Sequence, residues 1–396
     1  MSCKITKRLC RLIIVAFFVS GCASVRHAIP PELLGSARVF GMQDIRAFSG
    51  ISSDYLKKDF IKLLEQEQRN KSFFSDFNAD TYSIIAISGG ASDGAYGAGL
   101  LNGWSQTGTR PVFKVVTGVS TGAIIAPFVF LGSRYDDKLK EFYTKYSTKD
   151  IFRIRPSHNS LVSSQPLELL IEQYIDIKLL KEITVEYKKG RRLYVGTTNL
   201  DAEQLVIWDM GKIASVGEDK ALKLFRKLIL ASASMPIVFP PVYLNVEAND
   251  KIYDEMHVDG GVTRQVFFLY DVVQGFEKAA KEKGFNISKI KYAIYVIRNG
   301  YVDPFYKEVP DKLPAIAKRT VNTMINAQSL GDLYRLYIFT KEDKGDFNLA
   351  YIPAGYTPNS KEFFDPVEMQ KLFDLGFDEA SRGYPWKKAP PGLDIK

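Results

Sequence analysis

Apolar residues are grouped along this chain in short runs that predict buried β-strands. Three of these runs are mostly apolar, which is typical of a strand covered by helices on both faces. They span residues 83–87, 113–116 and 291–297. Weaker patterns predict four more strands, at residues 191–199, 204–208, 252–258 and 348–352.

Patterns of helical period lie between these strands. Residues 55–68 place apolar side chains among charged ones at helical spacing. Small, helix-compatible residues begin at Ala95 and again after Gly122. Later helices are predicted at residues 271–283, 313–336 and 365–382. Because strands and helices alternate, we expect an α/β fold with three α/β/α layers and a mostly parallel central sheet.

The composition fits one large domain behind a removable leader. The chain has 396 residues, of which 46% are hydrophobic and 25% charged, so it can bury a large core. We expect an export signal at residues 1–21, a lipidated cysteine and tether at 22–53, and one domain at 54–396. The formal charge of +8 falls to +4 without the four basic residues of the signal. That excess is too mild to indicate a nucleic-acid partner.

The leader ends at a cysteine. Its apolar run, residues 12–19, is too short to span a bilayer and indicates an export signal. The sequence Val19-Ser20-Gly21-Cys22 resembles a bacterial lipobox, in which small residues allow cleavage before a cysteine that carries diacylglycerol. The resemblance implies a membrane anchor at Cys22, in the bacterial cell envelope. Because Ala23 and not aspartate follows, we expect the outer membrane, with the protein facing the periplasm.

A serine between two glycines follows the strand predicted at residues 113–116. The sequence Gly118-Val119-Ser120-Thr121-Gly122 lies between this strand and a helix. In a nucleophile elbow, the glycines allow the tight turn and the serine hydroxyl projects from it. The helix adds a positive N-terminal end and a free backbone N–H at Thr121, which suit a developing oxyanion. Ser120 is therefore a candidate nucleophile.

A glycine-rich turn follows the strand predicted at residues 83–87. Gly89, Gly90 and Gly94 lie between that strand and the next helix. Such a turn presents backbone N–H groups in a concave nest that holds an anion. The spacing matches neither a dinucleotide-binding fingerprint nor a P-loop, which argues against a nucleotide. An oxyanion hole that serves Ser120 is the alternative.

A third stretch, residues 230–264, ends in an aspartate and two glycines. Its loop reads Ala-Ser-Ala-Ser-Met-Pro-Ile-Val-Phe-Pro-Pro over residues 231–241, and a predicted strand leads to Asp259-Gly260-Gly261. An aspartate at a strand end can point into a cleft, and it can equally be an ordinary turn residue. The residues alone leave these two possibilities open.

Four motifs in order resemble the patatin-like phospholipase family in its bacterial lipoprotein branch. They are the glycine-rich turn, Gly-x-Ser-x-Gly, Ser-x-Ser-x-Pro-x-x-Phe-Pro-Pro and Asp-Gly-Gly. The resemblance covers residues 82–299 clearly. It implies a Ser-Asp dyad, with Ser120 as the nucleophile and Asp259 as the general base. It also implies an oxyanion hole of backbone N–H groups around Gly89, Gly90 and Ala91. No cofactor or metal is implied.

The chain departs from the family pattern at two positions. The usual Gly-Gly-Gly-x-[Arg/Lys]-Gly is here Gly89-Gly90-Ala91-Ser92-Asp93-Gly94. We expect the alanine to be tolerated if its φ is negative. A carboxylate at Asp93 would oppose a nearby oxyanion unless it is paired or points away, so the departure concerns catalytic strength and not the fold.

Histidine is an alternative base. Of three histidines, His257 lies two residues before Asp259 and shares its face on an extended strand. We expect it to be a packed neighbour of the dyad. No His-Glu-x-x-His sequence and no Cys/His cluster is present, which argues against zinc hydrolysis.

The sequence therefore predicts a lipid-anchored serine acyl hydrolase that cleaves acyl esters, with phospholipids or lysophospholipids as substrates. Two alternatives stay open. One is a catalytically weak patatin fold that serves as an envelope interaction protein. The other is an acyltransferase, which forms the same acyl-enzyme and differs only in whether water or an alcohol enters second. The sequence does not specify an oligomeric state.

Overall fold

The computed structural model describes residues 26–69, 81–270, 276–285, 291–357 without 305 and 307, and 359–393 without 361. Cys22 and the predicted export signal lie outside these residues. In the described part of the chain, no helix is both long and apolar enough to cross a bilayer.

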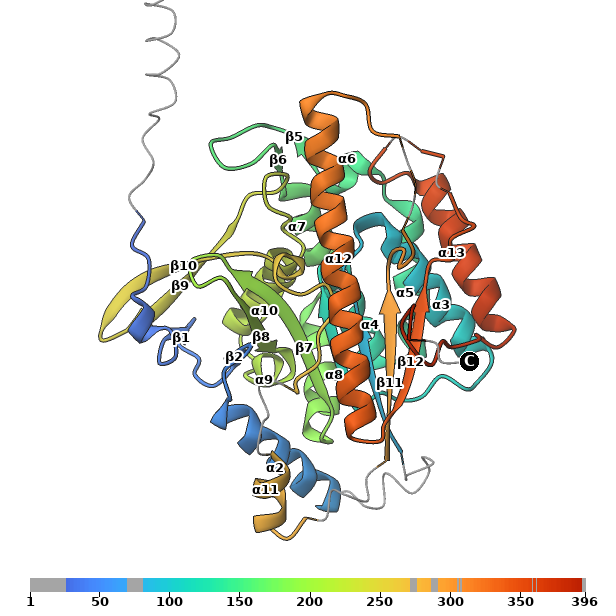
Figure 1. The fold of residues 1–396 in the computed structure, drawn as a ribbon. Helices are drawn as coiled ribbons and strands as arrows, with labels where there is room; N and C mark the ends of the chain where they lie inside the picture. The colour runs from blue at the N-terminus through green and yellow to red at the C-terminus, as the bar shows by residue number, and fades with distance from the viewer. Residues whose placement is uncertain are drawn as a thin grey trace, which may run out of the picture.

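Five parallel strands form one side of a large sheet, up to its edge at β12 (Figure 1). In spatial order they are β7 (Arg192–Asn199), β4 (Val115–Val119), β3 (Thr81–Ile87), β11 (Lys291–Arg298) and β12 (Asp346–Tyr351). Antiparallel strands extend the sheet beyond β7: β8 (Gln204–Asp209), β10 (Lys251–Asp259), β9 (Val242–Ala248), β1 (Arg38–Val39) and β2 (Arg46–Phe48). The predicted α/β fold is confirmed, with a mixed, mostly parallel sheet.

Helices cover both faces of the sheet because successive strand residues point to opposite sides. On β3, Ile85 and Ile87 join one hydrophobic cluster, whereas Ile84 and Ala86 join the other. The first cluster includes side chains of α3 (Gly94–Gln106), α4 (Thr121–Leu131), α5 (Asp136–Lys145), α7 (Gln165–Tyr174), α8 (Ile177–Lys188), α9 (Met210–Ser215), α10 (Asp219–Ser232) and α13 (Pro366–Ser381). The second includes side chains of α2 (Asp54–Arg69) and α12 (Leu313–Glu342).

Smaller elements complete the described chain. They are α6 (Thr148–Ile151), α11 (Phe276–Glu282), the hairpin of β5 (Arg153–Ile154) and β6 (Val162–Ser163), and four 3₁₀ turns. The turns are η1 (Pro31–Leu33), η2 (Ala91–Asp93), η3 (Ser133–Tyr135) and η4 (Gly260–Val262).

The strands and helices predicted from the hydrophobic pattern are present, with shifted boundaries. Strand β4 extends to Val119, so Gly118 lies inside the strand and not in the turn. Helix α12 continues to Glu342, six residues beyond its predicted end. Of the helix predicted at residues 271–283, the structure describes α11, and residues 271–275 lie outside the described part.

The predicted tether at residues 22–53 is wrong from residue 26 onward. Val39 and Ile45 are buried in the core, and β2 pairs with β8. Arg26 forms ion pairs with Asp201 and Asp254. The prolines and glycines of this segment shape short turns between brief strands, and their spacing resembles that of a linker. Only the residues before Arg26 are left as a possible tether.

Candidate active site

Ser120 occupies a strained turn between β4 and α4. Its backbone has φ 55° and ψ −124°, which L-residues rarely adopt. The turn is this tight because its glycines touch backbone: a Cβ at Gly118 would collide with the Gly122 carbonyl, and one at Gly122 with the Ile87 carbonyl. Such strain is typical of sites where a side chain must be presented from a sharp corner.

Sheet register brings Asp259 to the level of Ser120. Strand β8 pairs with one edge of β7, and β4 and β10 pair with the other, where Val119 is aligned with Gly196 and Asp259 with the next residue, Thr197. Ser120, one residue beyond Val119, therefore meets Asp259 on this edge of β7, where the end of β4 and the end of β10 face each other. The Ser120 hydroxyl is near enough to the Asp259 carboxyl to lower its pKa. The two predicted residues thus meet in the fold.

Asp259 is held in a buried, oriented position. Its side chain belongs to a residue that is 7% exposed and accepts the Gly261 N–H at 2.7 Å. Burial raises the pKa of Asp259 to about 6, and the Ser120 hydroxyl and the Gly261 N–H limit the rise. A carboxylate with this pKa is a better proton acceptor at neutral pH than an ordinary aspartate.

Two serines of the loop at residues 231–241 support the turn. The buried Ser232 hydroxyl donates to the Gly196 carbonyl at 2.6 Å and accepts the Ser120 N–H at 2.9 Å. The carbonyl of Ser234 accepts the Asp259 N–H at 2.9 Å. The Ser-x-Ser part of the motif therefore fixes the backbones of both Ser120 and Asp259.

The glycine-rich turn lies against Ser120, but one predicted oxyanion donor is engaged elsewhere. A Cβ built on Gly89 would lie 3.7 Å from the Ser120 Oγ. The Gly89 N–H, however, donates to the Gln265 carbonyl at 3.2 Å, which contradicts its assignment as an oxyanion donor. In the described chain, the N–H groups of Gly90, Ala91 and Thr121 have no acceptor, so these three stay candidates.

Arg298 fixes the peptide between Gly89 and Gly90. This arginine ends β11, is 4% exposed, and donates to the Gly89 carbonyl at 2.9 Å. The Ser88 hydroxyl donates to the same oxygen at 2.7 Å. Because carbonyl and N–H point in opposite directions across a trans peptide, both bonds direct the Gly90 N–H away from the buried arginine.

The positive charge of Arg298 also acts on the Asp93 carboxyl. Desolvation raises the pKa of this carboxyl to about 6, and the positive charge of Arg298 opposes that rise. Burial in turn lowers the pKa of Arg298 to about 10, with Asp93 acting against the shift. The family's basic position is thus acidic here, while a cation from β11 lies beneath the turn.

We expect Arg298→Met to lower kcat for a small ester about 100-fold, because the Gly90 N–H loses its fixed direction. The KM should change little, since Arg298 lies beneath the turn and not at the surface. Arg298→Lys keeps a charge and a donor, so it should recover part of the loss. Steady-state kinetics of the three proteins check this; an unchanged kcat in Arg298→Met would show that the arginine serves packing alone.

Ala91 has a backbone conformation that residues with a Cβ rarely adopt. It has a φ of +50°, so the condition under which the alanine was expected to be tolerated is not met. Positive φ strains a residue with a Cβ and is free of cost for glycine. Glycine, the usual residue at this position in the family, adopts such a φ without strain, whereas alanine does not.

We expect Ala91→Gly to raise the free energy of unfolding by about 1 kcal/mol, because the strain is removed. Its kcat should be equal to or above that of the parent. The matched variant Ala91→Val should lose stability, since a β-branched side chain tolerates positive φ least. Chemical denaturation of the three proteins tests the ranking, and equal stability of all three would contradict it.

Gln265 joins the glycine-rich turn to the Asp-Gly-Gly turn. Its carbonyl accepts the Gly89 N–H, and its side-chain amide donates to the Gly261 carbonyl at 2.7 Å. Its own N–H donates to the Asp332 carboxylate on α12 at 2.8 Å. The sequence did not predict this link, because neither Gln265 nor Arg298 belongs to the motifs found there.

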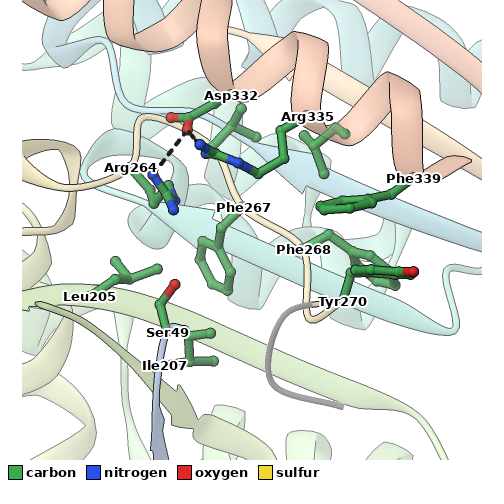
Figure 2. A pocket seen from close by; sticks show the side chains of 12 residues that line it. Ser49, Leu205, Ile207, Arg264, Phe267, Phe268, Tyr270, Asp332, Arg335 and Phe339 are labelled. Atoms are coloured by element: carbon green, nitrogen blue, oxygen red, sulfur yellow. Dashed lines mark hydrogen bonds and ion pairs between the residues drawn. The ribbon is translucent and has the colours of Figure 1, made fainter. Parts of the chain in front are cut away.

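Asp332 is itself held by two arginines (Figure 2). Its carboxylate lies 3.1 Å from Arg335 and 3.8 Å from Arg264. The pocket beside it, about 30 Å³ in volume, is lined mainly by apolar side chains including Phe267 and Phe339. That volume holds about one water molecule, so the pocket does not accommodate an acyl substrate.

His257 is not available as the base. One of its ring nitrogens bonds Glu255 at 3.0 Å and the other bonds the Thr197 hydroxyl at 2.9 Å. Glu255 also receives two hydrogen bonds from Arg46. The histidine is fully buried in this polar chain, which confirms that it is a packing residue.

Part of the chain matches a known protein family. Residues 85–270 match the family model for patatin-like phospholipase. This stretch includes β3, the glycine-rich turn, Ser120 and Asp259. No curated protein sequence matches the chain.

One solved structure with similarity to this chain is the crystal structure of VipD from Legionella pneumophila. The identity is 11% and the TM-score is 0.33. The match covers 76% of this chain and 66% of that one, so this chain spans just under two thirds of that structure's length. A similarity of this degree says nothing further about function.

Proposed function

We propose that this chain, which carries the acyl hydrolase domain of a patatin-like phospholipase, cleaves acyl esters of lipids with a dyad of Ser120 and Asp259. The observation that carries the proposal is the strained turn that presents Ser120 at the end of β4, directly against the buried Asp259 at the end of β10. The substrates we favour are the acyl esters of phospholipids or lysophospholipids.

The proposed reaction has two halves. The Ser120 Oγ bonds to the ester carbonyl carbon while its proton passes to Asp259, and the oxyanion is stabilised by the N–H groups of Gly90, Ala91 and Thr121. The bond to the leaving alcohol then breaks, and Asp259 returns the proton to that oxygen. Water attacks the acyl-enzyme with Asp259 again as base, which releases the fatty acid and restores Ser120.

Hydrolysis of short-chain aryl esters and of phospholipid vesicles by the purified protein tests this proposal. We expect turnover on both substrates. Absence of turnover on every ester would overturn it and favour the binding role. Release of acylated alcohol in place of fatty acid, when an alcohol acceptor is added, would indicate acyl transfer.

We also propose that the protein is anchored to a bacterial envelope membrane through a lipidated Cys22, with the outer membrane favoured. The support is the leader sequence, in which a basic start, a short apolar run and small residues precede the cysteine. Mass spectrometry of the mature N-terminus tests it. We expect a lipidated Cys22 in the parent and a protein without lipid for Cys22→Ser; an uncleaved leader would contradict the proposal.

A further inference from the structure

Two groups of exposed apolar side chains lie beside the candidate active site. The first comes from the β5–β6 hairpin and the loop after α10, where Ile154 is 84%, Leu161 53% and Ile237 70% exposed. The second comes from α12, where Leu313 is 80%, Val321 40% and Met324 66% exposed. These six residues are called the apolar rim.

The first half of the rim is one continuous surface. The Leu161 N–H donates to the Ile237 carbonyl at 2.9 Å, and the Arg155 N–H donates to the Leu161 carbonyl at 3.2 Å. Ile237 follows closely on Ser234, whose carbonyl accepts the Asp259 N–H. The surface therefore begins directly beside the proposed base and extends outward to the tip of the hairpin.

The second half of the rim is a stripe on one helix. Leu313, Val321 and Met324 are spaced by eight and three residues, which places them on one side of α12. Gln328 belongs to the same side, and its amide donates to the Val262 carbonyl at 3.2 Å, three residues after Asp259. The stripe thus starts at the opposite border of the site and runs outward along the N-terminal half of the helix.

The rim lies on the edge of the molecule at which the parallel strands end. Figure 1 shows the β5–β6 hairpin and the N-terminal end of α12 at the end to which the β11 arrow points. Large apolar side chains that are exposed around one site indicate an interaction surface. Arg153 and Arg155 flank the most exposed of them, Ile154, and are themselves exposed. Arginines beside an apolar tip suit the boundary between lipid headgroups and acyl chains.

The start of the described chain lies on the same edge. Arg26 bonds Asp201, in the turn after β7, and Asp254, which precedes the part of β10 that pairs with β7. Both partners lie beyond the level of Ser120 in the direction of the parallel strands. Cys22 is four residues before Arg26, so it is within about 14 Å of it. A lipid on Cys22 therefore brings this edge to the membrane.

We propose that the apolar rim docks onto the phospholipid bilayer in which the Cys22 lipid is inserted, so that Ser120 takes its substrate from that same membrane. This inference rests on the proposed function and names the physical form of its substrate. Soluble esters reach Ser120 without docking, whereas bilayer lipids require the rim to enter the interface.

The experiment uses the full chain, reconstituted in phosphatidylethanolamine–phosphatidylglycerol vesicles, with Ile154→Asp/Ile237→Asp and Leu313→Asp/Met324→Asp as rim variants. Val112→Asp/Val185→Asp is the control, because these residues are 49% and 52% exposed and precede β4 and β7, at the opposite edge of the sheet. We expect rim variants to lose at least about 10-fold in vesicle lipid hydrolysis and to keep soluble ester hydrolysis within about twofold. The control should keep both.

A second arm uses labelled lipid, placed either in the vesicles that carry the protein or in added vesicles. We expect hydrolysis to be at least about 10-fold faster in the carrying vesicles. Parental rates of vesicle hydrolysis in the rim variants would overturn the proposal, as would an equal loss on the soluble ester. A changed oligomeric state with intact vesicle hydrolysis would assign the rim to a second copy instead. Absence of soluble ester turnover in the parent would overturn the proposed function itself.

Discussion

Ser120→Ala should abolish ester hydrolysis, with a loss of at least about 10⁴-fold in kcat. The oxygen that would bond to the acyl carbon is removed, while the turn that presents it is retained. The Ser120 backbone bond to Ser232 involves the N–H and not the side chain, so alanine keeps it. We therefore expect a folded protein without activity. Hydrolysis of a short-chain aryl ester, together with circular dichroism, measures both properties.

The strained turn offers a matched control. Ser120→Gly also removes the hydroxyl, but it relieves the positive φ. We expect it to be as inactive as Ser120→Ala and more stable, by about 1–2 kcal/mol in the free energy of unfolding. Turnover that survives in either variant would exclude Ser120 as the nucleophile. Equal stability of the two would show that the turn is not strained.

Asp259→Asn should lower kcat about 10³-fold, because the amide cannot accept the Ser120 proton. The substitution keeps the shape of the side chain, and the amide oxygen can still accept the Gly261 N–H. A loss of this size with an unchanged fold would assign Asp259 as the base. Activity above a tenth of the parental value would instead require another proton acceptor.

The pH dependence follows from the raised pKa of Asp259. The base must be ionised, so kcat/KM should fall as the pH drops through about 6, and this limb should be absent in Asp259→Asn. Burial favours the protonated form in the folded protein, so this group makes the fold less stable as pH rises from about 4 to 6. At pH 7 the penalty amounts to about 3 kcal/mol. Asp259→Asn should therefore be more stable than the parent at pH 7 and equal to it near pH 3.

The order of motifs along the chain, through its resemblance to the patatin-like phospholipase family, identified the candidate dyad. Gly118 and Gly122 flank Ser120 because backbone crowding at this turn admits no side chain. Gly260 and Gly261 follow Asp259 for a similar reason, since a Cβ on Gly260 would collide with the Gly196 carbonyl. Requirements of this kind are local, and a single sequence displays them.

Other residues of the site could not be found in this way. Arg298 and Gln265 belong to no motif, and each reaches the glycine-rich turn from a distant part of the chain. The polar pair Arg298-Asn299 directly after an apolar strand was a signal that could have been noticed. The partner of Arg298, the Gly89 carbonyl, could not be predicted, because any residue can supply a backbone carbonyl as an acceptor.

The sequence by itself determined the strands and helices of the central sheet, the tight turn at Ser120, and the two turns rich in glycine. These depend on hydrophobic period and on backbone crowding, which act between near neighbours. Only the tertiary structure decided that β10 runs antiparallel to β7 and so sets Asp259 level with Ser120. It also decided that residues 26–53 pack onto the domain, that the Gly89 N–H is engaged, and that the apolar rim and Arg26 share one edge. Strand register and long-range packing fix these features, and both arise from contacts between segments far apart in the chain.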